Sequence, residues 1–249
     1  LAISAALATT THSVSAQVLE EVIVTAQKRA ENLQDVPISV SAVQGAQIKE
    51  AGIPNMAALA DYVPNLYIAE ASVNTNIFMR GVGSGNNQAF EQSVGMYIDG
   101  VYMGRGRQYR AGFLDVERVE VLRGPQGTLF GRNTVAGAVN ITTASNRAGD
   151  ALEGEIAASA EEFDGKRIDA HIGGSLSDTL GARLAVSWRE TDGYLDNTLL
   201  NQPEGGRDDT GVRLSLNWTP TDDVDINFKL SRFEGERTGA NSATKLYLS

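Results

Sequence analysis

The side chains that most often perform catalysis or bind metal ions are scarce in this sequence of 249 residues. It contains no cysteine and only two histidines, His12 and His171, which are far apart. Thiol chemistry, disulfide scaffolds and cysteine–zinc sites are therefore excluded, and neither histidine lies in a pattern typical of a catalytic triad or a metal site. No pair of carboxylates suggests acid–base catalysis. We expect no enzymatic activity, no cofactor and no metal site.

One short stretch has the composition of an anion-binding loop. Residues 101–110 (VYMGRGRQYR) gather basic and aromatic side chains, namely Tyr102, Arg105, Arg107, Tyr109 and Arg110. Guanidinium groups bind anions through charge-assisted hydrogen bonds, and the glycines of this stretch indicate a loop. We predict that the substrate-binding residues include Arg105, Arg107, Tyr109 and Arg110. The alternative is that these arginines pair with carboxylates of the same protein.

Nucleotides and nucleic acids are disfavoured as ligands. The glycine-rich stretch 81–85 (GVGSG) lacks the Lys-Ser/Thr pair of a phosphate-binding loop and opens no helix. The formal net charge is −10, from 31 acidic and 21 basic residues, whereas a nucleic-acid-binding protein presents a basic face to phosphate.

The first residues resemble the end of an export signal. Leu1–Ala8 is apolar, and Val14 and Ala16 occupy the two positions before Gln17 where signal peptidase accepts small residues. We interpret residues 1–16 as a truncated signal peptide. No later apolar run reaches the roughly 18 residues that a transmembrane helix needs, but an exported protein can also span a membrane as a barrel.

A β-prone run follows the predicted cleavage site. Val22–Ala26 (VIVTA) is flanked by acidic and basic residues, and no neighbouring strand in the sequence is available to pair with it. Such an unpaired segment suits β-augmentation, in which its backbone adds a strand to the sheet edge of a partner. The alternative is that it forms the first strand of the next domain.

A charged strand and a tight turn stand out in residues 115–142 (DVERVEVLRGPQGTLFGRNTVAGAVNIT). Gly124, Pro125 and Gly127 predict a turn after a strand at Val116–Leu122, because proline fixes φ and glycine accepts positive φ. The strand carries charges of both signs, at Glu117, Arg118, Glu120 and Arg123. Within a polar lumen such groups can form ion pairs that are screened less than surface pairs; the alternative is a solvated strand.

The elements that must position these residues fall into two zones. Residues 36–147 mix short strands with two short helices, which indicates a small α+β domain. The predicted helices are Gln44–Ala51 and Asn55–Tyr62. The predicted strands are Val36–Val43, Ile77–Arg80, Val94–Ile98, Val116–Leu122 and Ala138–Thr142, and residues 81–93 and 101–110 are predicted loops.

Residues 150–249 contain four segments with strict apolar–polar alternation, which is typical of strands with one apolar face. They lie around Ile168–Leu176, Leu184–Trp188, Val212–Trp218 and Val224–Leu230. The polar face carries Arg183, Arg213 and Lys229, which a water-filled lumen tolerates, and Trp188 and Trp218 lie at segment ends, where an aromatic girdle belongs. Short connections at 177–181 and 219–223 and a long one at 191–209 fit an outer-membrane barrel, although a soluble sheet would alternate in the same way.

Several of these motifs together resemble the TonB-dependent outer-membrane receptor family. Residues 20–26 (EEVIVTA) resemble the TonB box, and residues 115–142 resemble the closing half of the plug domain. Residues 79–84 (MRGVGS) and 94–102 (VGMYIDGVY) are similar to earlier plug strands and occur in the family's order. The resemblance implies an α+β plug domain followed by the first antiparallel strands of a large transmembrane β-barrel, here a fragment in which the barrel cannot close.

The resemblance also implies roles for individual residues. The box residues Glu20, Glu21, Val22, Ile23, Val24, Thr25 and Ala26 would bind the periplasmic domain of TonB, which transmits work from the inner-membrane motor complex. Arg118, Glu120 and Arg123 would fasten the plug to the barrel. We expect residues 1–16 to be the signal peptide, 17–35 the TonB-box segment and linker, 36–147 the plug and 148–249 the N-terminal barrel strands.

The expected location is the cell outer membrane, in contact with its lipid, and the expected activity is TonB-dependent uptake of a chelate, most simply a ferric siderophore. Haem, cobalamin and oligosaccharides are alternative cargoes within the family. A signal-transducing receptor is disfavoured because only Gln17–Leu19 separate the predicted cleavage site from the box. A structural or adhesive exported β-protein would leave the motifs of residues 20–142 unexplained.

Overall fold

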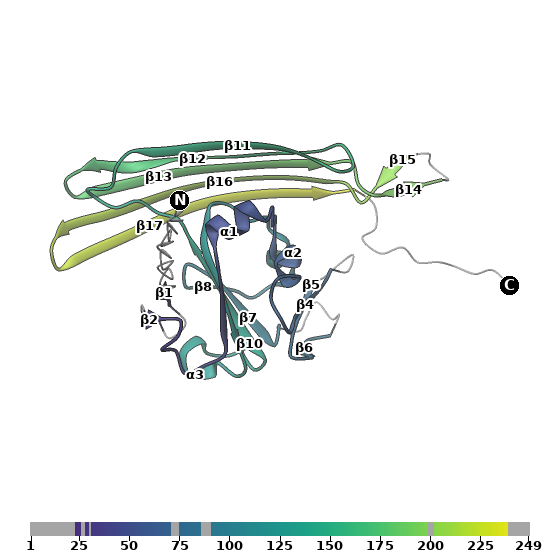
Figure 1. Cartoon of the computed structure of the whole chain (residues 1–249), viewed down its shortest axis with the longest axis horizontal. Helices are drawn as coiled ribbons and strands as arrows, with labels where there is room; N and C mark the ends of the chain where they lie inside the picture. The colour runs from purple at the N-terminus through teal and green to yellow at the C-terminus, as the bar shows by residue number, and fades with distance from the viewer. Residues whose placement is uncertain are drawn as a thin grey trace, which may run out of the picture.

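The computed structural model describes residues 23–25, 28–29, 31–70, 75–85, 91–198 and 202–238. A small mixed domain, here called the α+β domain, lies against one face of a long antiparallel sheet (Figure 1). The predicted signal peptide and the box residues Glu20, Glu21, Val22 and Ala26 lie outside the described residues. Among the described residues, no helix has the length and apolar character required to cross a membrane.

The α+β domain is built on a five-stranded sheet with the order β3-β9-β10-β7-β8. The pair β10–β7 is parallel and the other pairs are antiparallel. Its strands are β3 (Val40–Gln44), β7 (Val94–Ile98), β8 (Val101–Met103), β9 (Val116–Arg123) and β10 (Gly137–Thr143). A smaller sheet beside it contains β4 (Leu66–Glu70), β5 (Thr75–Met79) and β6 (Val82–Gly83).

Short helices cover one face of the five-stranded sheet. Helix α1 (Gly45–Glu50) begins where Gly45 passes so close to β9 that a Cβ atom there would overlap the carbonyl oxygen of Val116. Helix α2 (Met56–Ala60) begins after Asn55, whose side chain accepts a hydrogen bond from the Ala58 amide at 3.0 Å, the usual role of an N-cap asparagine. The remaining helical turns are η1 (Gly106–Arg110) and α3 (Gly127–Phe130).

The two faces of β9 contact different parts of the chain, because successive side chains of a strand point to opposite faces. Val119 and Val121 are fully buried in the main core, with Ile48 of α1 and Leu59 of α2. The opposite face presents Glu120 and Leu122. There Leu122 and Ala138 join a second apolar cluster that contains Val24, Val36 and Tyr97.

The long sheet has the order β11-β12-β13-β16-β17 and is antiparallel throughout. Its strands are β11 (Glu153–Glu161), β12 (Gly165–Ser177), β13 (Leu180–Thr191), β16 (Arg207–Thr221) and β17 (Val224–Arg237). Figure 1 shows it arching over the α+β domain, with the hairpin β14 (Leu195–Asn197) and β15 (Gln202–Glu204) at one end. In the described residues its edge strands β11 and β17 do not pair with each other.

Side chains of the long sheet divide by type between its two faces. Arg183, Arg213 and Lys229 form hydrogen bonds to the α+β domain. Large apolar side chains that alternate with them remain exposed, among them Ile168, Ile172, Leu184, Val212, Trp218, Ile226, Phe228 and Leu230. This is the alternation expected from the sequence, and it leaves the sheet with one polar face partly covered by the α+β domain and one apolar face uncovered.

The observed elements correct several expectations. Strand β3 begins at Val40 rather than Val36, and Pro37 within the predicted strand has no N–H to donate to a ladder. The predicted loops contain β6, β8 and η1. Strands β4 and β11 and helix α3 were not expected.

Candidate functional site

The N-terminal segment Ile23–Thr25 is docked on the α+β domain. Ile23 and Val24 form β1, which pairs antiparallel with β2 (Glu31–Asn32). Val24 is fully buried in the second apolar cluster, whereas 42% of Ile23 is exposed. The expectation that this segment is unpaired is wrong for the described residues, because β2 supplies the neighbouring strand. The segment nevertheless joins no larger sheet.

A buried carboxylate fixes the end of this segment. Glu120 of β9 is fully buried and accepts hydrogen bonds from the Thr25 backbone amide at 2.6 Å and from the Thr25 hydroxyl at 3.1 Å. Arg118 donates to the same carboxylate at 2.9 Å and to the Thr25 hydroxyl at 3.2 Å. Asn140, which lies opposite Glu120 on β10, donates to its second oxygen at 3.1 Å. The carboxylate therefore has a charged partner and several donors, as burial of a charge requires.

The three residues predicted to fasten the domain to the barrel have other partners here. Within the described part of the chain, the hydrogen bonds of Arg118 and Glu120 stay among β9, β10 and Thr25. Arg123 donates to the carbonyl oxygen of Pro64 at 3.0 Å and to the Ser41 hydroxyl at 2.6 Å. The predicted barrel-fastening role of these three residues stays a prediction.

Arg123 differs from the other two in having only neutral acceptors among the described residues. Burial lowers the pKa of Arg123, and the nearby charge of Arg80 lowers it further. Two neighbouring arginine charges favour a carboxylate partner, which is compatible with the predicted role of Arg123.

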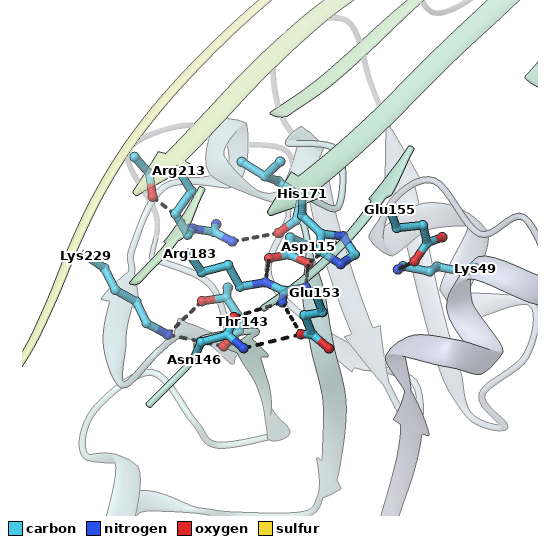
Figure 2. A network of polar contacts seen from close by, with 12 residues as sticks. Lys49, Asp115, Thr143, Asn146, Glu153, Glu155, His171, Arg183, Arg213 and Lys229 are labelled. Carbon is cyan, nitrogen blue, oxygen red and sulfur yellow. Dashed lines mark hydrogen bonds and ion pairs between the residues drawn. The ribbon is translucent and has the colours of Figure 1, made fainter. Parts of the chain in front are cut away.

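The most buried ion pair between the domain and the long sheet, among the described residues, is made by Asp115, directly before β9. Its carboxylate receives two hydrogen bonds from the Arg183 guanidinium of β13, at 2.6 and 2.9 Å (Figure 2). Their side chains are only 7% and 8% exposed. Burial alone would raise the pKa of Asp115, but the hydrogen bonds and charge of Arg183 outweigh burial and hold this pKa below its ordinary value.

Residues around this ion pair complete a polar network (Figure 2). Arg183 also binds Glu153 of β11 at 2.7 Å and the Asn146 side chain at 3.0 Å. His171 of β12 lies with its Nδ1 atom 3.9 Å from the Asp115 carboxylate. The network therefore joins the start of β9 to three adjacent strands of the long sheet.

Further polar contacts lie on either side of this network. Lys229 of β17 binds Asp99 and the Thr143 hydroxyl, each at 2.8 Å. Arg213 of β16 donates to the carbonyl oxygen of Leu114 at 2.6 Å. On the other side, Lys49 of α1 binds Glu155 of β11 at 2.8 Å, and both side chains of this pair are about half exposed. A cavity of about 440 Å³ lies beside it, between α1 and strands β11 and β12.

The predicted substrate-binding cluster is divided by the fold. Tyr109 is 1% exposed and belongs to the main core, so its side chain is not presented to a ligand and the structure gives it a packing role instead. Arg110 binds the Thr75 hydroxyl at 2.7 Å, while Arg105 is exposed. The side chain of Arg107 lies outside the described residues.

The sheet-side arginines and lysine of this contact were expected on the polar face, but their partners in the α+β domain were not singled out in the sequence. Asp115, Asp99 and Thr143 lie at strand ends, where a lone polar residue is common. The inward-facing Arg183 and Lys229 gave a signal, because full charges on the polar face of a predicted barrel strand call for partners inside the lumen. The described residues contain no group of three or more acidic or histidine side chains placed to hold a metal ion.

A small α+β domain is held by charged contacts against the polar face of a long sheet, and the other face of this sheet is apolar and uncovered. This arrangement is typical of the class of membrane receptors with an internal plug. Comparison with known families agrees, since residues 32–138 match the TonB-dependent Receptor Plug Domain. The pesticin receptor of Yersinia pestis is 29% identical over 190 residues, which are 75% of this chain and 27% of that protein. The vitamin B12 transporter BtuB of Vibrio vulnificus is 26% identical over 188 residues, 74% of this chain and 30% of that protein.

A solved structure gives the same answer. The ferric yersiniabactin uptake receptor FyuA from Yersinia pestis has a TM-score of 0.72 and 27% identity, covering 80% of this chain and 32% of that chain. The protein therefore carries, at residues 32–138, the plug domain of the TonB-dependent outer-membrane receptors, and these comparisons place it in the outer membrane. The α+β domain is its plug, and the long sheet is a run of antiparallel barrel strands. The chain spans between a quarter and a third of the length of these relatives.

Proposed function

We propose that this protein is a TonB-dependent transporter that takes up a scarce nutrient across the outer membrane, and that its cargo is a ferric siderophore or a similar iron chelate. The observation that carries the proposal is the docked segment Ile23–Thr25, a short β-prone tether held on a plug that rests on a polar wall. The relative that takes up ferric yersiniabactin supports an iron chelate as cargo. The relative named as a vitamin B12 transporter makes cobalamin the main alternative.

The proposed mechanism couples two sites through the plug. Cargo binds from outside at the plug apex, with Arg105 as a candidate contact, and favours a plug state in which the N-terminal segment is released on the periplasmic side. The C-terminal domain of TonB then adds a strand to the released segment and pulls. Such coupling requires that the cargo binds one plug state more tightly than the other. None of these steps requires the protein to make or break a covalent bond.

The nature of the contacts between plug and barrel suits a plug that must move. Those among the described residues are mainly ion pairs and hydrogen bonds, and the cavity of about 440 Å³ leaves room beside α1. Polar interfaces of this kind are typical of domains that rearrange relative to each other. A tightly packed apolar interface would hold the plug in place throughout.

The apolar face of the barrel strands fits outer-membrane lipid. Trp218 pairs with Leu180 at one end of the apolar stretch, and Trp188 pairs with Thr210 and Ile168 at the other. At about 3.3 Å per residue, the eight steps from Leu180 to Trp188 span about 26 Å. A strand tilt of about 40° reduces this to about 20 Å along the membrane normal, comparable with the roughly 25 Å band between the aromatic girdles of such barrels.

Uptake of labelled cargo tests the proposal. We expect deletion of the gene to abolish growth on one defined ferric siderophore as sole iron source, and a copy with Val24→Pro to bind the ⁵⁵Fe-labelled chelate at the cell surface without accumulating it. The substitution removes an N–H that an added strand needs and displaces a buried side chain. Normal accumulation in this variant would contradict the TonB-dependent mechanism, and unchanged iron acquisition with lost cobalamin uptake would replace the cargo.

A further inference from the structure

The plug buries one carboxylate beside the N-terminal segment, and we propose that this residue, Glu120, is the latch that holds the TonB-contacting segment docked. The proposal rests on the function proposed above and deepens it, because it assigns control of the segment to one positioning residue. Glu120 is fully buried, although its strand neighbours on the same face include Leu122, a member of an apolar cluster. A buried charge is costly unless it is paired and hydrogen-bonded, so its presence there needs a reason.

The contacts of Glu120 supply that reason. Its carboxylate accepts both donors of Thr25, the backbone amide at 2.6 Å and the hydroxyl at 3.1 Å. Arg118 balances the charge of the carboxylate and also donates to the Thr25 hydroxyl at 3.2 Å. Asn140 reaches both residues, with its amide 3.1 Å from the carboxylate and 3.3 Å from the hydroxyl. The whole cluster converges on one threonine of the tether.

Docking through these bonds competes with addition of a partner strand. The backbones of Ile23 and Val24 are engaged by β2, and the Thr25 amide is engaged by Glu120. A strand from a partner would require backbone donors and acceptors of the same three residues. Full pairing of these three residues with a partner therefore requires the Thr25 amide to leave Glu120, and release of Thr25 from Glu120 is a step between docking and pairing.

The strength of the latch sets the fraction of molecules that expose the segment. Hydrogen bonds to an ionised acceptor are roughly twice as strong as neutral ones. Replacing the carboxylate with the isosteric amide in Glu120→Gln keeps an acceptor for the Thr25 amide but removes the charge that makes these bonds strong. We expect the undocked fraction to rise about tenfold. The apparent affinity for a partner rises by the same factor when only the undocked state binds it.

The test uses the receptor in detergent micelles without cargo. The 249 residues include no cysteine, so Ile23→Cys provides a spin-label site at a partly exposed position, and Tyr67→Cys provides a reference site on β4 that is 64% exposed. In Glu120→Gln we expect the mobile spectral component at position 23 to increase about tenfold, with no change at position 67. Without label, binding of the purified TonB C-terminal domain should tighten by a similar factor.

Matched variants separate the latch from a general effect on the plug. Glu117→Gln removes another acidic partner of Arg118 on the same strand, but Glu117 has no hydrogen bond to Thr25 among the described residues; we expect it to behave as wild type. Thr25→Ser keeps the hydroxyl and should also match wild type, whereas Thr25→Val should give an intermediate release. Thermal unfolding of each variant reports the stability of the plug.

Two results would overturn the latch. One is an immobile label at position 23 in Glu120→Gln; the other is equal loosening at positions 23 and 67 with a lowered melting temperature, which would make Glu120 a general structural residue. Failure of the proposed function looks different. In that case the label is released in Glu120→Gln, yet the TonB domain binds neither the wild type nor any variant.

Discussion

The ion pair between Asp115 and Arg183 gives a quantitative test of how the plug is held. Replacing Arg183 with alanine leaves the Asp115 carboxylate buried without its main partner, and breaking a buried pair in this way costs about 3–5 kcal/mol. We expect about 3 kcal/mol, the lower end, because Asp115 borders the cavity of about 440 Å³, through which water reaches the carboxylate, and His171 stays close by.

Hydrogen exchange measures this loss at a nearby amide. The Ala144 amide donates to the carbonyl oxygen of Asp115 at 2.9 Å, so its protection reports opening of this contact. A loss of about 3 kcal/mol corresponds to roughly 100-fold faster exchange, since about 1.4 kcal/mol is a factor of ten. Mass spectrometry of peptides covering Asp115 and Ala144 in the detergent-solubilised receptor gives the rate.

Two further variants should accelerate exchange less than Arg183→Ala does. Asp115→Asn keeps the shape of the side chain and leaves Arg183 with Glu153 as a charged partner, so its effect should be smaller than that of Arg183→Ala. Lys49→Ala breaks a pair whose side chains are about half exposed, and exposed pairs contribute about 0–1 kcal/mol. If Lys49→Ala accelerates exchange as much as Arg183→Ala does, burial does not decide the strength of these contacts and the reasoning fails.

Two further predictions follow from the titration and packing of single residues. Because the folded pKa of Asp115 lies below its ordinary value of 3.8, the stability that it contributes is fully present above that value and is lost as the pH falls through the folded pKa. The protection of the Ala144 amide, taken relative to the intrinsic exchange rate at each pH, should therefore fall in acid in the wild type but not in Asp115→Asn. Tyr109→Phe should leave the melting temperature unchanged or raised, and cargo binding intact. The reason is that the Tyr109 hydroxyl is buried with no hydrogen-bond partner among the described residues, and leaving such a group unpaired carries a cost. A large loss of cargo affinity in calorimetry would restore the predicted ligand role of Tyr109.

The sequence predicted those parts of the fold that depend on local pattern. Strict alternation placed Arg183, Arg213 and Lys229 on the face that contacts the plug. Strand β8 was missed although its signal was present: Asp99 and Gly100, both with positive φ, form the Asp-Gly turn that is typical of a hairpin between two strands. We predicted a ligand-binding loop there instead, because Arg105, Arg107 and Arg110 follow the turn. The domain boundaries at residues 16, 35 and 147 stay predictions.

The site depended on contacts that no local pattern encodes. The Glu120 side chain and the Thr25 amide are separated by 95 residues in the sequence, and a charge on a strand indicates only that it needs a partner, without indicating which. The run at Val22–Ala26 gave the β-prone character of the tether, but not its pairing with β2, because Glu31 and Asn32 are residues with low preference for strands.

Strand β9 connects the two clusters, and their relative strengths set an order of events. Glu120 within β9 holds the tether, and Asp115 directly before β9 holds the barrel wall. The tether is held by the hydrogen bonds that Thr25 shares with Glu120, Arg118 and Asn140, by pairing with β2 and by burial of Val24. The start of β9 is held by a buried two-bond ion pair, with flanking contacts from Arg213 and Lys229. A pull on the N-terminal segment acts on the contacts of Thr25 first, so we expect the tether to be free while the plug still lies against the wall.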